Sequence, residues 1–182
     1  LLTAAYQARI MSNQLALRDA YRKENTNDKK NVDVEKVHQA YKLAKTVAFA
    51  QGFNLYRDAS NKYNWNLNLK QIAAIFRAGC IIQAKLLQDI MHAYDDGADD
   101  LLLYPVFKNE VLENTSALKE IVVQSIDLPL PVFTAALTYI NQLSSTCLGA
   151  NIIQGQRDFF GAHTYQRVDR EGFEHHQWGS YE

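Results

Sequence analysis

The sequence holds few of the residues that mark tight turns, covalent cross-links or membrane spans. Among its 182 residues are only 8 glycines, 3 prolines and 2 cysteines. Strand-like alternation of apolar and polar residues is also rare, which disfavours a sheet-based fold. No apolar run approaches the roughly 20 residues of a membrane-spanning helix, and the first residues lack the long apolar stretch of a signal peptide. We therefore expect no membrane partner.

A surplus of charge of one sign is missing as well. The 19 lysines and arginines nearly balance the 20 aspartates and glutamates, and the two signs are interspersed. A protein that binds nucleic acid or anionic membranes without specificity needs a concentrated basic surface, so this class is excluded. The two cysteines, Cys80 and Cys147, are far apart within apolar segments. We interpret them as reduced, buried thiols of a cytoplasmic protein.

Common catalytic and metal-binding motifs are absent too. The sequence contains no G-x-G-x-x-G or G-x-x-x-x-G-K-[ST] phosphate loop, no H-E-x-x-H and no paired C-x-x-C. Neither a nucleotide cradle nor a zinc site is therefore expected within it. The acidic run "MHAYDDGADD" lacks EF-hand spacing and predicts a solvated turn. His175 and His176 could bind a transition metal, but neighbours on an extended segment point opposite ways, so we expect no metal site.

What the sequence does have is a helical period. Apolar residues make up 47% of the chain, as in ordinary globular proteins, and many recur three and four positions apart. This pattern predicts an all-α fold with helices over residues 2–23, 34–55, 68–94, 101–107, 109–126, 132–145 and 150–160. Residues 23–33 are polar and predict a loop, and the prolines of "DLPLP" end the helix before them.

The predicted domain organisation is simple. Residues 1–163 are expected to form one helical domain, and residues 164–182, which show no period, an extended tail. The chain begins inside a predicted helix and without an initiator methionine, which is how a fragment of a longer protein would start.

One stretch near the C-terminus, "IIQGQRDFFGAHTYQRV", carries two cationic groups around an aromatic pair. If its helix ends near Gly161, Arg157 lies in the last turns and His163 just beyond, so both can project toward one point. An arginine fork matches a phosphate or carboxylate in two parallel hydrogen bonds, and a histidine can donate to a neighbouring hydroxyl or oxyanion. The hypothesis is an anion site, and the alternative is a core helix that simply ends at Gly161. For Arg9, in "AYQARIMSN", the residues alone favour a surface salt bridge.

Four stretches, in order, resemble the C-terminal helical domain of the 6-phosphogluconate dehydrogenase family: "KLAKTVAFAQGFNLYRDAS", "WNLNLKQIAAIFRAGCIIQA", "LPLPVFTAALTYIN" and "NIIQGQRDFFGAHTYQR". The resemblance implies an all-helical domain that forms most of a homodimer interface, beside an N-terminal domain that binds NADP. In this family, carbon 3 of 6-phosphogluconate is oxidised by hydride transfer. The β-keto acid then loses CO2, and the enediol is protonated to ribulose 5-phosphate.

The resemblance also assigns roles to residues. Arg157 matches the arginine that reaches the substrate phosphate in the partner subunit's active site, and His163 the histidine at the substrate's polar end or hydroxyls. Arg9 matches an arginine that binds the phosphate from the same subunit. The family's general-base lysine and general-acid glutamate fall upstream, so no catalytic residue is expected here and the segment alone should be inactive. The tail of residues 164–182 is expected to cross to the partner subunit.

A second hypothesis is a catalytically silent dimerisation scaffold derived from the same family. A silent copy would be free to lose Arg9, Arg157 and His163, and all three are present. The chain departs from the family pattern at Gln83, where a basic residue is common, and in the short polar loop of residues 23–33. From the sequence, both functions stay open.

Overall fold

The computed structural model describes residues 1–22, 32–77 and 85–179, which fall into two compact units, residues 1–140 and 141–182. The described residues of the first unit are helical, and the second joins one helix to a short pair of strands. The predicted all-α class is confirmed. No helix in the described ranges is long and apolar enough to cross a membrane.

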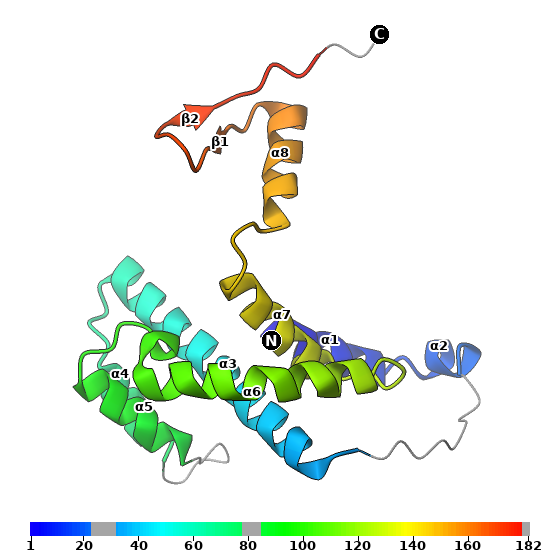
Figure 1. Cartoon of the computed structure of the whole chain (residues 1–182), viewed down its shortest axis with the longest axis vertical. Coiled ribbons are helices and arrows are strands. Elements are labelled where there is room, and N and C mark those ends of the chain that lie inside the picture. The colour runs from blue at the N-terminus through cyan, green and yellow to red at the C-terminus, as the bar shows by residue number, and fades with distance from the viewer. Residues whose placement is uncertain (23–31, 78–84, 180–182) are drawn as a thin grey trace. The chain divides into compact units, whose positions relative to one another are not determined.

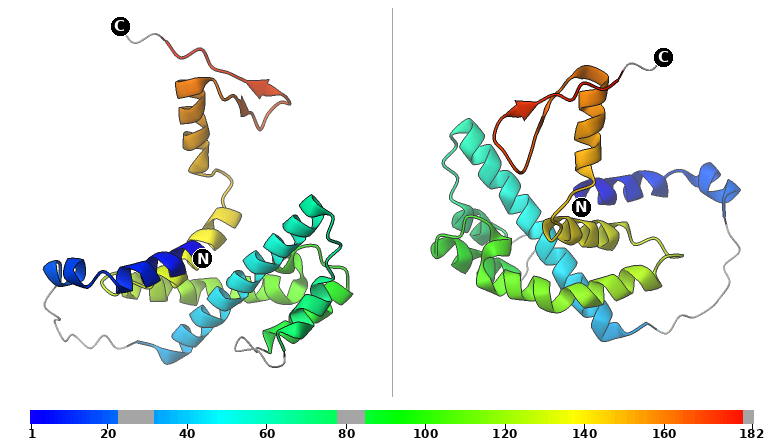
Figure 2. Two further views of the ribbon diagram at one scale, coloured as in Figure 1. Left: turned by 180° about the vertical axis from the view of Figure 1, so that it is seen from behind. Right: turned by 45° about the horizontal axis from the view of Figure 1, so that its top comes forward.

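Two long helices, α3 (Val34–Tyr63) and α6 (Pro105–Gln124), form the centre of the first unit and pack across each other (Figure 1, Figure 2). Helix α3 begins where the Asp33 side chain accepts the backbone N–H groups of Glu35 and Lys36, a strong N-cap. It ends at Asn64, whose left-handed backbone (φ 54°) stops the helix. Helix α6 begins at Pro105, which needs no backbone donor in that position.

One apolar cluster surrounds the C-terminal half of α3. It includes α4 (Leu69–Ile75), α5 (Leu86–Asp95), the 3-10 helix η1 (Leu101–Leu103) and the start of α6. Helix α4 begins at Asn68, whose side chain accepts the N–H of Gln71. The buried side chains of this cluster are Ala50, Phe53, Ala73, Leu86, Leu87, Ile90, Ala93, Leu101 and Phe107.

A second apolar cluster surrounds the N-terminal half of α3, where it meets the end of α6 and α7 (Pro131–Leu143). Its buried side chains are Ala40, Leu43, Ala44, Val47, Leu118, Ile121, Ala136 and Ile140. On the α3–α6 contact lies the nearly buried carboxylate of Glu110. Its Oε1 accepts from Thr46 Oγ1 (2.6 Å) and its Oε2 pairs with Lys42 Nζ (3.3 Å). The two central helices are thus joined by apolar and polar contacts.

The N-terminal helices differ from this pattern. Helix α1 (Leu2–Ser12) and helix α2 (Leu15–Ala20) contribute no buried side chain. The predicted single helix over residues 2–23 is wrong, because the chain breaks at Asn13 and Gln14. The break leaves Gln14 outside helical geometry (φ −85°, ψ 60°).

The second unit consists of α8 (Ala150–Gly161) followed by β1 (Tyr165–Gln166) and β2 (Phe173–Glu174). The strands pair antiparallel, with Tyr165 opposite Glu174 and Gln166 opposite Phe173. The aperiodic tail therefore folds back on itself for two residues a side. The predicted division into residues 1–163 and a partner-crossing tail, residues 164–182, stays a prediction.

Three other predictions need correction. A continuous helix over residues 68–94 is wrong, because α4 ends at Ile75 and a turn follows at Phe76 and Arg77. Residues 101–107 are not a separate α-helix, since Pro105 already opens α6. Cys147 is free but exposed rather than buried, because its segment links α7 to α8 outside both clusters. Cys80, Gln83 and the loop over residues 23–31 lie outside the described residues.

Candidate functional site

The candidate anion site lies at the C-terminal end of α8, where the backbone makes an unusual turn. Ala162 caps the helix in a left-handed conformation (φ 49°, ψ 39°) and donates its N–H to the Asp158 carbonyl (2.9 Å). Thr164 is also left-handed (φ 61°), although it is β-branched. Such conformations cost non-glycine residues of order 1 kcal/mol or more, so the surroundings must hold them. His163 lies between these two strained residues.

The carboxylate of Asp158 holds this turn to the tail. Its side chain is fully buried and accepts four hydrogen bonds, two at each oxygen. Oδ1 accepts from the Thr164 backbone N–H (3.0 Å) and from His175 Nδ1 (2.9 Å). Oδ2 accepts from the His176 backbone N–H (3.0 Å) and from Trp178 Nε1 (3.0 Å). One side chain therefore fastens both the turn after α8 and the tail.

The pKa of Asp158 reflects this arrangement. Burial alone would raise it, but the hydrogen bonds from the His175 ring, two backbone N–H groups and the Trp178 indole outweigh burial and hold the pKa well below its usual range. The side chain is therefore a carboxylate at neutral pH. Because a carboxylate only accepts, Nδ1 of His175 must carry a proton.

The imidazole of His163 lies against the bare backbone of Gly161. A Cβ atom at Gly161 would come within 3.0 Å of His163 Nε2 and 3.1 Å of its Cδ2, closer than such atoms normally approach. The absence of a side chain at this one position therefore makes room for the histidine ring. His163 itself is exposed.

Arg157 is joined to the same turn through Gln154. The Gln154 side chain donates its Nε2 to the Thr164 carbonyl and accepts at Oε1 from Arg157 Nη1 (3.3 Å). Arg157 is exposed, and within the described residues no carboxylate pairs with it. The structure thus places Arg157 and the turn that carries His163 in one hydrogen-bonded assembly, with the guanidinium available to an anion.

Arg9 belongs to the other unit, in the last turn of α1. It is exposed, and its side chain forms neither a hydrogen bond nor an ion pair in the part of the chain that the structure describes. The salt bridge considered as its alternative role is not formed there. Its predicted role in phosphate binding stays a prediction.

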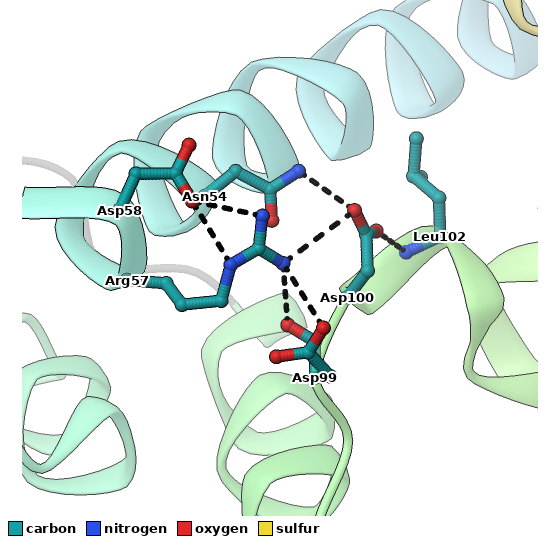
Figure 3. A network of polar contacts seen from close by, with 6 residues as sticks. All are labelled: Asn54, Arg57, Asp58, Asp99, Asp100 and Leu102. Carbon is teal, nitrogen blue, oxygen red and sulfur yellow. Dashed lines mark hydrogen bonds and ion pairs between the residues drawn. The ribbon is translucent and has the colours of Figure 1, made fainter. Parts of the chain in front are cut away.

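A contrasting arginine in the first unit shows what a structural role looks like (Figure 3). Arg57 is partly buried, donates to Asp58 and to the Asp99 carbonyl, and lies within ion-pair distance of three carboxylates. Asp100 also accepts from Asn54 and from the Leu102 N–H, which ties η1 to α3. The acidic run predicted as a solvated turn is thus solvated at Asp99 but structural at Asp100. Arg57 is neutralised, whereas Arg157 is not.

A groove in the second unit shares Gln154 with this site and is lined by α8, β1, the residues that follow β1, and the tail. Its lining residues are Asn151, Gln154, Gly155, Tyr165, Gln166, Arg167, Val168, Asp169, His176 and Trp178. Arg167 donates from Nε and Nη2 to the two carboxylate oxygens of Asp169 (2.7 and 2.6 Å), so its charge is already paired. His175 is held by Asp158, and the His176 ring packs edge-on against Trp178. Across the described ranges, no three metal-ligating side chains are grouped.

Comparison with known proteins decides the family. Residues 1–178 match the family model described as "6-phosphogluconate dehydrogenase, C-terminal domain". The chain belongs to this family. The resemblance inferred from four sequence stretches is therefore confirmed, and it extends over nearly the whole chain.

Several relatives of this 6-phosphogluconate dehydrogenase C-terminal domain are known. The decarboxylating 6-phosphogluconate dehydrogenase of Salmonella typhimurium is 48% identical over 149 residues, covering 80% of this chain and 32% of the relative. That of Staphylococcus epidermidis strain ATCC 35984 is 48% identical over 155 residues, covering 83% and 33%. The chain thus spans about a third of the length of these relatives.

A solved structure shows the same fold. The chain is similar to Plasmodium falciparum 6-phosphogluconate dehydrogenase, a structure studied in its apo form and in complex with its cofactor NADP+ and its substrate 6-phosphogluconate. The two share 33% identity with a TM-score of 0.82, over 93% of this chain and 38% of that one.

The sequence pattern indicates Arg157 and His163 as site residues, which stays a prediction. It does not single out the residues that contact them or their turn, namely Asp158, Gln154 and Gly161. A signal for Asp158 was present. A carboxylate in the last turn of a helix faces the negative end of the helix dipole, so an aspartate there needs donors from elsewhere. The donors lie in the tail segment that includes "HHQW".

Proposed function

We propose that this chain is the substrate-phosphate-binding and dimer-forming part of an NADP-dependent enzyme that converts 6-phosphogluconate to ribulose 5-phosphate and CO2. The observation that carries the proposal is an exposed Arg157, unpaired with any carboxylate within the described residues and hydrogen-bonded through Gln154 to the turn that carries His163. Family membership supports it, as does the cofactor NADP+ of the Plasmodium falciparum relative. The catalytic lysine and glutamate and the cofactor domain are expected in other parts of the full-length enzyme.

The chemistry of the ligand fits these residues. A phosphate dianion that leaves water needs more than one cation and several donors. Arg157 offers a planar fork of donors, and His163 offers a ring nitrogen at a fixed place. Arg9 is the proposed second guanidinium, contributed by the other subunit of a homodimer. Because no single chain would then hold the complete phosphate site, the dimer is the active unit and this segment alone turns over no substrate.

Exposed apolar side chains in the second unit support the proposed dimer. Ile152 and Ile153 on α8, Phe160 at its end and Phe173 in β2 are all more than half exposed. Because a partner would shield such side chains from water, their exposure in the single chain fits a surface that a second subunit covers. Replacing Phe173 with serine should weaken dimerisation, which sedimentation at low concentration measures. An unchanged dimer would exclude Phe173 from the interface.

The test of the phosphate role is Arg157→Ala in the full-length enzyme. Hydrogen bonds to charged groups contribute about 1.5–3 kcal/mol each, so losing the fork should raise the substrate KM by roughly 10-fold or more. The cofactor KM should change little, because NADP binds elsewhere. Arg170→Ala is the matched control: Arg170 is an exposed arginine of the same unit that is already paired with Glu174. An unchanged substrate KM in Arg157→Ala would refute the proposal.

Titration calorimetry separates the enzyme from the silent scaffold of the same family. The full-length dimer should release or absorb heat when 6-phosphogluconate is added at millimolar concentration, and Arg157→Ala should diminish the signal. No heat from an intact dimer would favour the scaffold.

A further inference from the structure

The second unit contains a buried charge that the proposed function does not explain. Asp158 is shielded from solvent and is the one buried residue among residues 141–179 of its unit. If Asp158 only fastened the tail, contacts with His175, His176 and Trp178 would be enough. Asp158 also accepts from the Thr164 N–H, directly after His163.

We propose that Asp158 is a positioning residue for substrate binding: through Thr164 it locks the turn that presents the His163 imidazole to the substrate. The proposal rests on the proposed function of His163. It concerns a residue that makes no contact with the substrate and acts only through the histidine.

The turn that carries His163 has a strained backbone. His163 lies between Ala162 and Thr164, both in left-handed conformations that non-glycine residues seldom adopt. A free chain would leave these conformations and swing the imidazole away. Three hydrogen bonds oppose this: Ala162 N–H to the Asp158 carbonyl, Thr164 N–H to Asp158 Oδ1, and Gln154 Nε2 to the Thr164 carbonyl. Two of the three end on Asp158.

The surroundings of the Asp158 side chain require a carboxylate. All four of its partners are donors, two at each oxygen. Asparagine has nearly the same shape but replaces one oxygen with an NH2 group, which cannot accept. With the NH2 group at the Oδ2 position, the His176 N–H and the Trp178 indole would both face a donor; at the Oδ1 position the Thr164 N–H would face a donor even if the His175 ring changed its tautomer. The site is therefore built for a carboxylate, and Asp158→Asn removes its function with little change of volume.

Gly161 limits where the His163 ring can lie. Its missing side chain leaves room for the ring, with a hypothetical Cβ only 3.0 Å from His163 Nε2. The ring is therefore fixed from two sides, by the backbone anchored on Asp158 and by the surface of Gly161. An alanine there would displace the imidazole without touching the carboxylate.

A double-mutant cycle in the full-length enzyme tests the proposal. The four proteins are wild type, Asp158→Asn, His163→Ala and the double variant, and for each we would measure kcat, the substrate KM and the cofactor KM. We expect Asp158→Asn to raise the substrate KM by roughly 10-fold while the cofactor KM stays within about 2-fold. In the His163→Ala background the same change should add less than about 2-fold, because residues that act through one another are not additive.

A merely structural role gives a different pattern. It would lower kcat through loss of active protein, leave KM unchanged, and add its full effect in the His163→Ala background. Either an unchanged substrate KM or a full additive effect would overturn the proposal. Asp169→Asn is the matched control: it makes the same chemical change at an exposed carboxylate of the same unit that pairs with Arg167 and does not touch the turn.

Gly161→Ala covers the case in which Asp158→Asn fails to fold, as far-UV circular dichroism would reveal. It keeps all four hydrogen bonds of the carboxylate, and alanine is the better helix former. We expect a raised substrate KM that disappears in the His163→Ala background, and a KM that stays at the wild-type value would then overturn the proposal. Failure of the proposed function looks different, because Arg157→Ala and His163→Ala would themselves leave the substrate KM unchanged.

Discussion

Each of the two units of this chain is stabilised internally by a different kind of interaction. In residues 1–140, two apolar clusters along α3 bury leucine, isoleucine and phenylalanine side chains. In the described part of the second unit, residues 141–179, the one buried residue is a carboxylate, Asp158. Apolar burial is strong but non-directional, whereas hydrogen bonds to a carboxylate fix directions. The first unit is therefore built for stability, and the second for placing a few groups.

The largest loss of stability is expected from a substitution in the apolar core of the first unit. Phe107 lies in the cluster around α5 and η1 and is the largest of the fully buried side chains among the described residues. Phe107→Ala should lower the free energy of unfolding by about 3–5 kcal/mol, through lost burial and the cavity left behind. Urea denaturation followed by circular dichroism measures the change.

The control truncates an exposed side chain of the second unit that the proposed interface does not include. Val168 is fully exposed, so Val168→Ala should cost about 1 kcal/mol or less. Equal losses at the two positions would contradict the contrast between the units.

The next largest expected effect is that of acid, which should destabilise the second unit. The folded pKa of Asp158 lies below its unfolded value of about 3.9. The stability that this group contributes is therefore complete above about pH 3.9 and is lost as the pH falls toward the folded pKa. The Trp178 indole, a donor to Asp158, reports this change.

The chain has two tryptophans, so Trp65→Phe isolates the emission of Trp178. We expect the change of this emission that accompanies the release of Trp178 from Asp158 to occur only below about pH 4, once the carboxylate begins to take up a proton. The same scan of Asp158→Asn should show no such transition. A transition centred above the usual carboxyl pKa would show that Asp158 is not stabilised as a carboxylate.

The smallest effect concerns one hydrogen bond inside the first unit. Thr46→Val keeps the shape of the side chain but removes the donor to the nearly buried Glu110. The expected cost is about 1–3 kcal/mol, since a buried acceptor loses a partner. Thr138→Val, at an exposed threonine that bonds only to its own helix, is the control and should cost far less. Similar costs would mean that Glu110 is already satisfied by Lys42.

Much of the fold was predictable because it follows from local chemistry. The helical period located α3, α6, α7 and α8, and the cap at Asn68 and the stop before Pro131 follow from side-chain chemistry alone. The helices predicted over residues 2–23 and 68–94 were extended too far by their period, whereas the helix predicted over residues 34–55 was too short, because α3 continues to Tyr63. Nothing in the apolar spacing signals the break at Gln14, because residues on both sides are exposed and no packing selects one continuous helix.

The site was predictable only in part. Arg157 and His163 follow from the chemistry of anion recognition and from the family resemblance, while Asp158 depends on contacts with residues up to twenty positions later. The exposure of Cys147 escaped for a similar reason, since an apolar neighbourhood in sequence is not a neighbourhood in space. Long-range pairing of polar groups leaves little periodic trace.

The bare backbone at Gly161 gives a criterion for sorting homologous genes. An orthologue that encodes arginine and histidine at the positions of Arg157 and His163 would pass any survey based on ligand residues alone. If its codon 161 specifies a larger amino acid, the ring would meet a methyl group where this protein leaves open space. Surveys of gene duplicates should therefore record the residue at the position of Gly161 as well as the charged residues of the site.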